Sequence, residues 1–126
     1  MTTAEREAVH RTAVRAALGV PGVVALQPAL AERLALAASR VFEAVAAGAS
    51  RAPEGAGVRC EITPDGAWHL EVRCILDEDH RVVDVARRVR SEVRAAVNAC
   101  LNQHDAAPPP PVRVLVNVTR TIPTPA

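Results

Sequence analysis

The stretch from Gly57 to Cys74, GVRCEITPDGAWHLEVRC, predicts a β-hairpin. Apolar residues alternate with polar ones on both sides of residues 64–66 (Pro-Asp-Gly), as is typical of strands that are buried on one face. Proline, aspartate and glycine in this order suit a type I turn followed by a left-handed glycine, which is a common three-residue hairpin loop. Such a loop pairs Thr63 with Ala67 and thereby sets the register of both strands.

This register sorts the hairpin into two chemically different faces. One face carries the pairs Val58–Val72, Cys60–Leu70 and Ile62–Trp68, and the other carries Arg59–Glu71 and Glu61–His69. A two-residue loop would set apolar residues opposite polar ones throughout, so the three-residue loop is the favoured interpretation. Opposite charges that face each other across the strands should add roughly a few tenths of a kcal/mol each.

Hydrophobic periodicity predicts the remaining elements. They are a helix over 3–18, a short strand over 23–26, a helix over 28–48, a helix over 80–102 and a last strand that begins at Val112. Four prolines at 108–111 predict a stiff polyproline connector before that strand. The order α-β-α-β-β-α-β predicts an α+β fold, a two-layer sandwich in which helices cover one face of a small mixed sheet. We expect one domain over residues 1–126.

The composition bounds the classes of function. The net charge is +1 and every basic residue is arginine, which argues against a strongly electrostatic partner for the protein as a whole but not against a local patch. Three widely spaced cysteines do not make a disulfide framework, so we expect reduced thiols. Neither a signal peptide nor a membrane-spanning segment is predicted, so membrane association would have to go through a partner or a surface.

The cysteines are the first candidates for chemistry. In the predicted register Cys60 and Cys74 share a face but lie about 13 Å apart along the hairpin, which is beyond the reach of a disulfide. Cys100 falls on the apolar face of the helix over 80–102, and the sequence holds no CxxC motif. We therefore interpret all three as small buried hydrophobes and predict no metal site.

His69 and Glu61 are the second candidate, because a glutamate can orient a histidine that acts as a general base. No nucleophile is predicted beside them, since Cys60 and Cys74 point to the other face. A solvated cross-strand pair is the favoured interpretation, and Trp68 is interpreted as core. The sequence also lacks a Walker loop and a Gly-rich dinucleotide turn, so we predict no catalytic residue and no cofactor.

Arg87, Arg90 and Arg94 form a stripe along the helix over 80–102, and none of them has an acidic residue four positions later. The stripe is either a solvated face, a partner-binding surface or a site for an anionic ligand. RNA is the specific alternative, but the aromatic residues that could stack on bases, Phe42 and Trp68, are predicted to be buried. Residues 19–22 (Gly-Val-Pro-Gly) match the bare GxxG of a KH loop, although a helix-to-strand turn explains them.

Several segments together resemble the alkaline-shock-protein family of bacterial envelope-stress proteins. They are AVRAALGVPGVVAL, the hairpin GVRCEITPDGAWHLEVRCIL, the helix VVDVARRVRSEVRAAV and the terminal VRVLVNVTRTI. Members of that family share a helix that ends in a VPGV-like turn, a GVxVE-type strand, a longer alternating strand, an amphipathic helix near a PEVA-like motif and a closing VxVxV strand. The resemblance covers roughly residues 8–26 and 57–122. The helix over 28–48 and the connector at 108–111 depart from the family pattern.

The resemblance implies a non-enzymatic cytoplasmic protein that serves envelope stress or homeostasis as a binding or scaffold module. It implies recruitment to the inner face of the cytoplasmic membrane by a membrane-anchoring protein partner, and self-association. It implies neither a small-molecule substrate nor direct membrane insertion. The stripe of Arg87, Arg90 and Arg94 is the candidate partner-binding site, and a small RNA-binding module that uses the same stripe is the alternative function.

Overall fold

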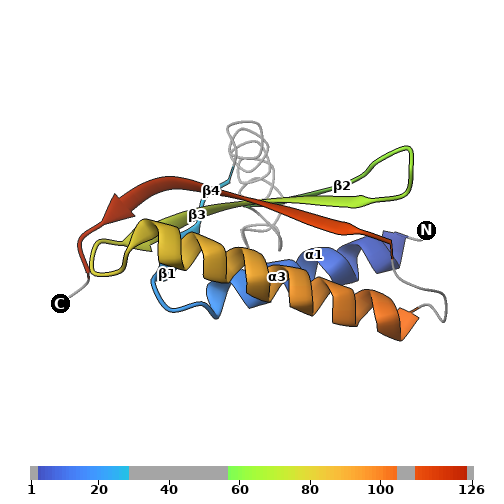
Figure 1. Cartoon of the computed structure of the whole chain (residues 1–126), viewed down its shortest axis with the longest axis horizontal. Coiled ribbons are helices and arrows are strands. Elements are labelled where there is room, and N and C mark those ends of the chain that lie inside the picture. The colour runs from blue at the N-terminus through green and yellow to red at the C-terminus, as the bar shows by residue number, and fades with distance from the viewer. Residues whose placement is uncertain (1–2, 29–56, 105–109, 125–126) are drawn as a thin grey trace, which may run out of the picture.

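The computed structural model describes residues 3–28, 57–104 and 110–124. Its elements are α1 (Thr3–Leu18), β1 (Val23–Leu26), β2 (Val58–Ile62), β3 (Trp68–Asp77), α3 (Val82–His104) and β4 (Val112–Ile122) (Figure 1). The α+β class is confirmed. Residues 29–48 of the helix predicted over 28–48, and the first half of the connector at 108–111, lie outside the described residues.

The longer hairpin strand, β3, is the centre of a four-stranded mixed sheet. β1 and β2 pair antiparallel with one side of β3, and β4 pairs parallel with the other side. A parallel pair needs a crossover connection, and α3 supplies it between β3 and β4. Figure 1 shows α1 and α3 side by side on one face of this sheet, so the described residues form two layers.

The hairpin register is confirmed at all five predicted pairs of β2 and β3. The Thr63 N–H donates to the Ala67 carbonyl at 2.8 Å, and the Gly66 N–H donates to the Thr63 carbonyl at 2.9 Å. Gly66 has a φ of 89°, as a left-handed glycine at the end of a three-residue loop requires. The turn residues and the alternation of the strands therefore specify the same pairing.

The ion pairs on this face differ from the predicted cross-strand pairs. The Glu61 Oε1 lies 2.5 Å from the Nη2 of Arg59 on the same strand. The Glu71 Oε1 lies 3.3 Å from the Nη1 of Arg73, again on the same strand. Residues two apart in a strand share a face, and a long arginine side chain can reach along that face to a neighbouring carboxylate. The sequence correctly predicted which residues face each other across the two strands. It did not predict which of these residues form ion pairs.

β1 and β2 meet on the same side of β3 at Arg73. The Arg73 N–H donates to the Gly57 carbonyl at 2.9 Å, and the Arg73 carbonyl accepts from the Gln27 N–H at 2.8 Å. Gly57 has a φ of 93°, and a Cβ at this position would lie 2.6 Å from the Cβ of Leu26. Glycine is therefore required where the ends of the two strands approach each other.

The core lies between the helices and the inner face of the sheet. α3 contributes valines at four-residue intervals, which places them on one face of the helix; these are Val85, Val89, Val93 and Val97, all at most 4% exposed. α1 buries Val9, Ala13 and Ala17. From the sheet, the inner residues of β3 close the core, and Trp68 is fully buried as predicted.

Two local features lie outside the predicted pattern. α3 begins at Val82 rather than near residue 80, because the Asp77 carboxylate organises the preceding turn by accepting from the Asp79 N–H and from His80. The hydrogen bond with His80 is the main cause that lowers the pKa of Asp77. In β4 the register with β3 shifts by one residue at Thr119, whose hydroxyl donates to the Cys74 carbonyl.

Candidate interaction surface

The predicted reactive side chains are separate from one another in the structure. Cys60 and Cys74 are 6% and 0% exposed and face the core, whereas Cys100 is half-buried at its edge. Burial raises the pKa of Cys60 to about 11, despite the opposing effect of Arg6, and burial also raises the pKa of Cys74. In the described parts of the chain, no three His, Cys, Asp or Glu residues are grouped as a metal site would require.

His69 and Glu61 face each other across the hairpin, as predicted. The Glu61 carboxylate pairs with Arg59 instead of His69. Both residues line an open depression of about 310 Å³ on the outer face of the sheet, together with Arg113 and Leu115 of β4. No cysteine lines this depression, since the thiols of β2 and β3 belong to the opposite face.

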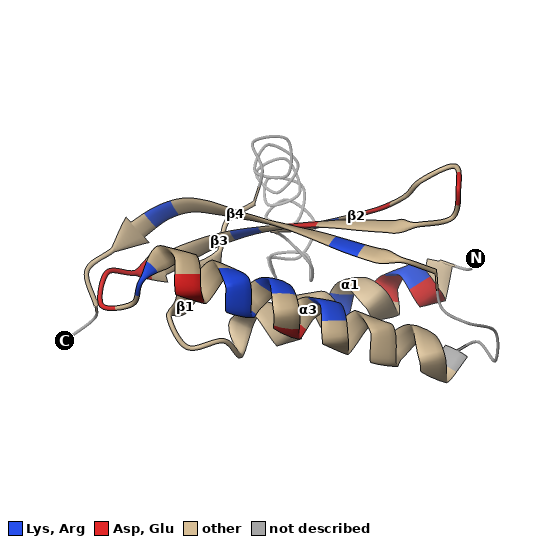
Figure 2. Ribbon diagram, viewed as in Figure 1, with Lys and Arg blue, Asp and Glu red and all other residues tan. Residues whose placement is uncertain are grey.

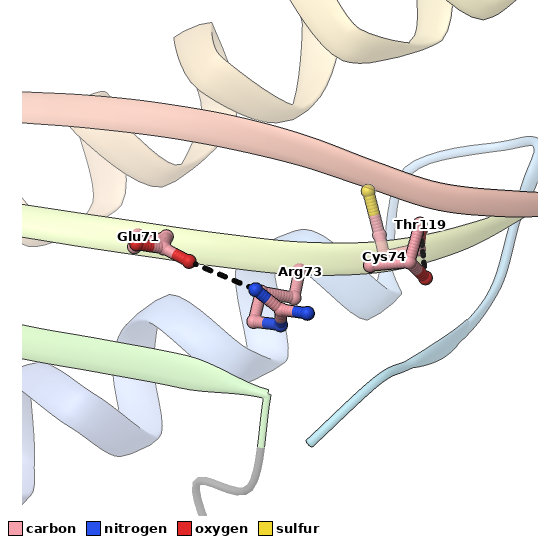
Figure 3. Close-up of polar contacts among 4 residues, drawn as sticks. All are labelled: Glu71, Arg73, Cys74 and Thr119. Atoms are coloured by element: carbon pink, nitrogen blue, oxygen red, sulfur yellow. Dashed lines mark hydrogen bonds and ion pairs between the residues drawn. The ribbon is translucent and has the colours of Figure 1, made fainter. Parts of the chain in front are cut away.

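Arg73 marks the middle of the same outer face. Figure 3 shows its side chain reaching back along β3 to Glu71, while the Cys74 side chain leaves the strand on the other side. The Arg73 Nε is buried without a hydrogen-bond partner. The Arg73 side chain as a whole is 29% exposed.

The predicted stripe of arginines on α3 is present at the surface. Arg87, Arg90 and Arg94 are all exposed, and none forms an ion pair with a residue that the structure describes. They line one shallow surface with Ser91 and Asn98. Val83, which is 55% exposed, belongs to the same flank of the helix by its spacing.

This arginine flank is the side of α3 that faces away from α1. The other flank of α3 instead borders α1, and a shallow groove between the two helices is lined by Glu92, Ala95 and Ala96 of α3 and by Thr12, Arg15 and Ala16 of α1. α1 packs under β1 and β2, whereas α3 packs under β4. The arginine flank, defined as Val83, Arg87, Arg90 and Arg94, therefore lies at the β4 edge of the molecule. Figure 2 shows basic positions along α3 and in β4 on this side.

Beside this flank, β4 presents a backbone edge with which no other described strand pairs. In a parallel ladder each residue directs its N–H and its C=O to the same side, and successive residues alternate. Pro111 bonds to β3 through its carbonyl, which accepts from the Trp68 N–H at 2.8 Å. By the same alternation, four residues of β4 direct their N–H and C=O groups away from β3, namely Val112, Val114, Val116 and Val118. No described residue bonds to these backbone groups.

On the opposite edge of the sheet, side chains of α1 contact two backbone carbonyls of β2. The Arg6 Nη2 donates to the Cys60 carbonyl at 2.7 Å, and the His10 ring contacts the Val58 carbonyl through Nε2. These carbonyls are the outward-facing acceptors of β2. Sequence reasoning predicted association through an exposed sheet edge and a helix flank, but it did not identify which edge, nor the contacts of Arg6 and His10. An 11-residue terminal strand with no proline inside it was the available signal for the open edge.

Comparisons with known proteins add no relatives: no family model matches the sequence, and no curated protein or solved structure is significantly similar to it. Within the described residues, neither helix combines the length and the apolar character that a membrane crossing needs.

Proposed function

We propose that the protein is a non-catalytic binding or scaffold module that associates through the β4 edge and the arginine flank of α3. The observation that supports this most is the contrast between the two sheet edges. Arg6 and His10 contact two outward-facing carbonyls of β2, whereas β4 has four outward-facing residues to which no described residue bonds. Exposed edges favour pairing with another chain, and proteins usually blunt them unless the pairing is used.

The cellular setting of this proposal comes from the sequence resemblance. We propose a role in envelope stress or homeostasis, with recruitment to the inner face of the cytoplasmic membrane by a membrane protein. Self-association, which the resemblance also implies, would use a surface other than the β4 edge. The buried thiols support a non-catalytic role, because a raised pKa keeps Cys60 protonated at neutral pH and thus a poor nucleophile.

The RNA-binding alternative depends on the same arginines but has weaker support. Single-stranded nucleic acids are held by aromatic side chains on which bases stack, in addition to basic residues. Trp68 is fully buried in the core and cannot offer such a platform. Phe42, the other candidate, lies outside the described residues.

Site-specific photo-crosslinking in the native cell tests the proposed function. A photoreactive amino acid replaces Val83 on the arginine flank in one strain and Ala99, an exposed residue of the opposite flank, in another. We expect a membrane protein to be cross-linked from position 83 and not from position 99. Failure to recover any protein from either position, together with a strictly monomeric species at high concentration, would contradict the proposal.

A further inference from the structure

We propose that the β4 edge and the arginine flank form one docking site for an acidic, extended segment of a partner protein, which adds to the sheet as a strand beside β4. This inference rests on the proposed function and specifies the chemistry of the partner. It combines two independent observations, namely a row of β4 backbone groups and a set of arginines beside it, neither of which has a partner among the described residues.

The backbone of β4 supplies the first half of the site. Val112, Val114, Val116 and Val118 offer alternating donors and acceptors at the edge, so an added strand can form a ladder without disturbing the bonds between β4 and β3. Their side chains belong to the core: Val112 is 3% exposed and the other three pack against it. The shift at Thr119 interrupts the ladder, so the docking stretch runs from Val112 to Val118.

The arginine flank supplies the second half. Side chains of an added strand alternate between the two faces of the sheet, so every second one points to the side where α3 lies. Arg87 and Arg94 are about 10 Å apart along the helix, and alternate residues of a strand are about 6.6 Å apart. Two or three alternate positions of the added strand can therefore lie over the three guanidinium groups.

The positive charge of the arginine flank favours an acidic segment over a second copy of this chain as the strand that pairs with β4. Carboxylates at those alternate positions would give Arg87, Arg90 and Arg94 the ion-pair partners that the described structure does not supply. A second copy of this chain would bring its own three arginines instead, because two-fold pairing of the β4 edges places the two α3 flanks next to each other. Six like charges along one seam oppose that dimer.

The β4 strand itself adds positive charge and no negative charge. Arg113 and Arg120 occur in β4, which has neither aspartate nor glutamate. Arg113 stands opposite His69 and Arg120 opposite Ile75, both on the outer face of the sheet. Within the docking stretch, an acidic strand would consequently meet Arg113 on the outer face and the arginine flank on the other face, whereas a basic strand would be repelled on both.

Fluorescence anisotropy with a labelled peptide tests this site on the full chain. The probe is a peptide of about ten residues in which glutamate alternates with threonine. The variant R87Q/R90Q/R94Q removes the flank, and R15Q/R81Q/R88Q removes the same charge from exposed positions away from it. We expect about tenfold weaker binding to the flank variant, because three exposed ion pairs are lost, and a change of less than about threefold for the control variant.

Two modified probes separate strand addition from simple charge attraction. Methylation of alternate backbone nitrogens removes the donors that a ladder needs and should abolish binding, although the charge is unchanged. A peptide with lysine in place of glutamate should not bind. Equal binding of the methylated or the lysine peptide, or tighter binding of a uridine oligonucleotide than of the acidic peptide, would overturn the proposal.

Failure of this inference can be told apart from failure of the proposed function. If the acidic peptide does not bind while a membrane protein is still cross-linked from position 83, the module binds a partner of different chemistry. If the peptide binds as expected but no membrane protein is cross-linked, the docking site is real and the proposed recruitment is wrong.

Discussion

At the scale of single residues, Cys60 and Cys74 show how the core determines the state of a side chain. Both thiols point into an apolar interior that disfavours the thiolate, and the pKa of Cys60 rises from its usual 9.0 to about 11. The chain contains neither lysine nor tyrosine. No lysine or tyrosine side chain therefore titrates in the alkaline range beside these two thiols.

This gives the first prediction. Between about pH 9 and pH 11 the unfolded state loses the Cys60 proton and the folded state keeps it, so stability falls as pH rises. The free energy of unfolding should fall by about 1–3 kcal/mol across this window. The variant Cys60→Ala should show a clearly smaller fall. Urea unfolding followed by the fluorescence of the buried Trp68 measures both; equal slopes for the two proteins would contradict the assignment.

Gly57 and Gly66 give a second prediction at this scale, because they share a positive φ but differ in their surroundings. An added Cβ at Gly66 meets no atom within 4 Å, whereas at Gly57 it meets Leu26 at 2.6 Å. Gly66→Ala should cost about 1 kcal/mol from backbone strain alone. Gly57→Ala should cost roughly 3 kcal/mol or more, since the clash adds to the strain. Thermal unfolding of the pair tests this, and equal costs would show that β1 and β2 do not meet as described.

At the scale of elements, the hairpin could be predicted and the sheet could not. Pro64, Asp65 and Gly66 fix a turn type, and the alternation of the strands admits only one register, so local information is sufficient. The placement of β4 beside β3 depends on packing between segments far apart in the sequence. The same holds for the edge contacts of Arg6 and His10, because nothing local in α1 indicates that these side chains reach β2.

The stripe of arginines on α3 could be predicted only in part from the sequence. Helical spacing predicted that Arg87, Arg90 and Arg94 share one exposed flank, and the structure confirms it. Their role in binding depends on which other elements lie beside them in the fold. Helical spacing alone does not predict those neighbours. Only the parallel pairing of β3 with β4 brings an open strand edge next to the flank.

The alternation of backbone groups along β4 gives the third prediction. The amides of Val114 and Val116 point to the open edge and should exchange with solvent at least about tenfold faster than those of Leu115 and Asn117, which point to β3. Hydrogen exchange resolved by residue with NMR measures this pattern. Addition of the acidic peptide should slow the fast pair specifically. Uniformly slow exchange in the free protein would mean that the β4 edge is already covered.

At the scale of the whole molecule, the two edges of one sheet have opposite properties. Side chains from α1 contact two carbonyls of the β2 edge, whereas no described residue bonds to the outward-facing backbone of β4, which has positive charge beside it. The net charge of only +1 hides this arrangement, because acidic residues such as Glu61, Glu71 and Glu92 lie elsewhere. This distribution of charge should oppose pairing of the β4 edge with the β4 edge of a second copy of the chain. It should favour pairing with an acidic strand.

The fourth prediction follows from that arrangement. At low ionic strength the wild-type protein should not pair through β4, because two arginine flanks would repel each other across the seam. The variant R87Q/R90Q/R94Q lacks that repulsion and should dimerise more readily, and salt near 0.5 M should shift the wild type in the same direction because it screens the charges. Sedimentation velocity measures the association, with R15Q/R81Q/R88Q as the charge-matched control. A wild-type dimer at low salt in which the Val114 and Val116 amides are protected would show that a second copy, and not an acidic partner, occupies this edge.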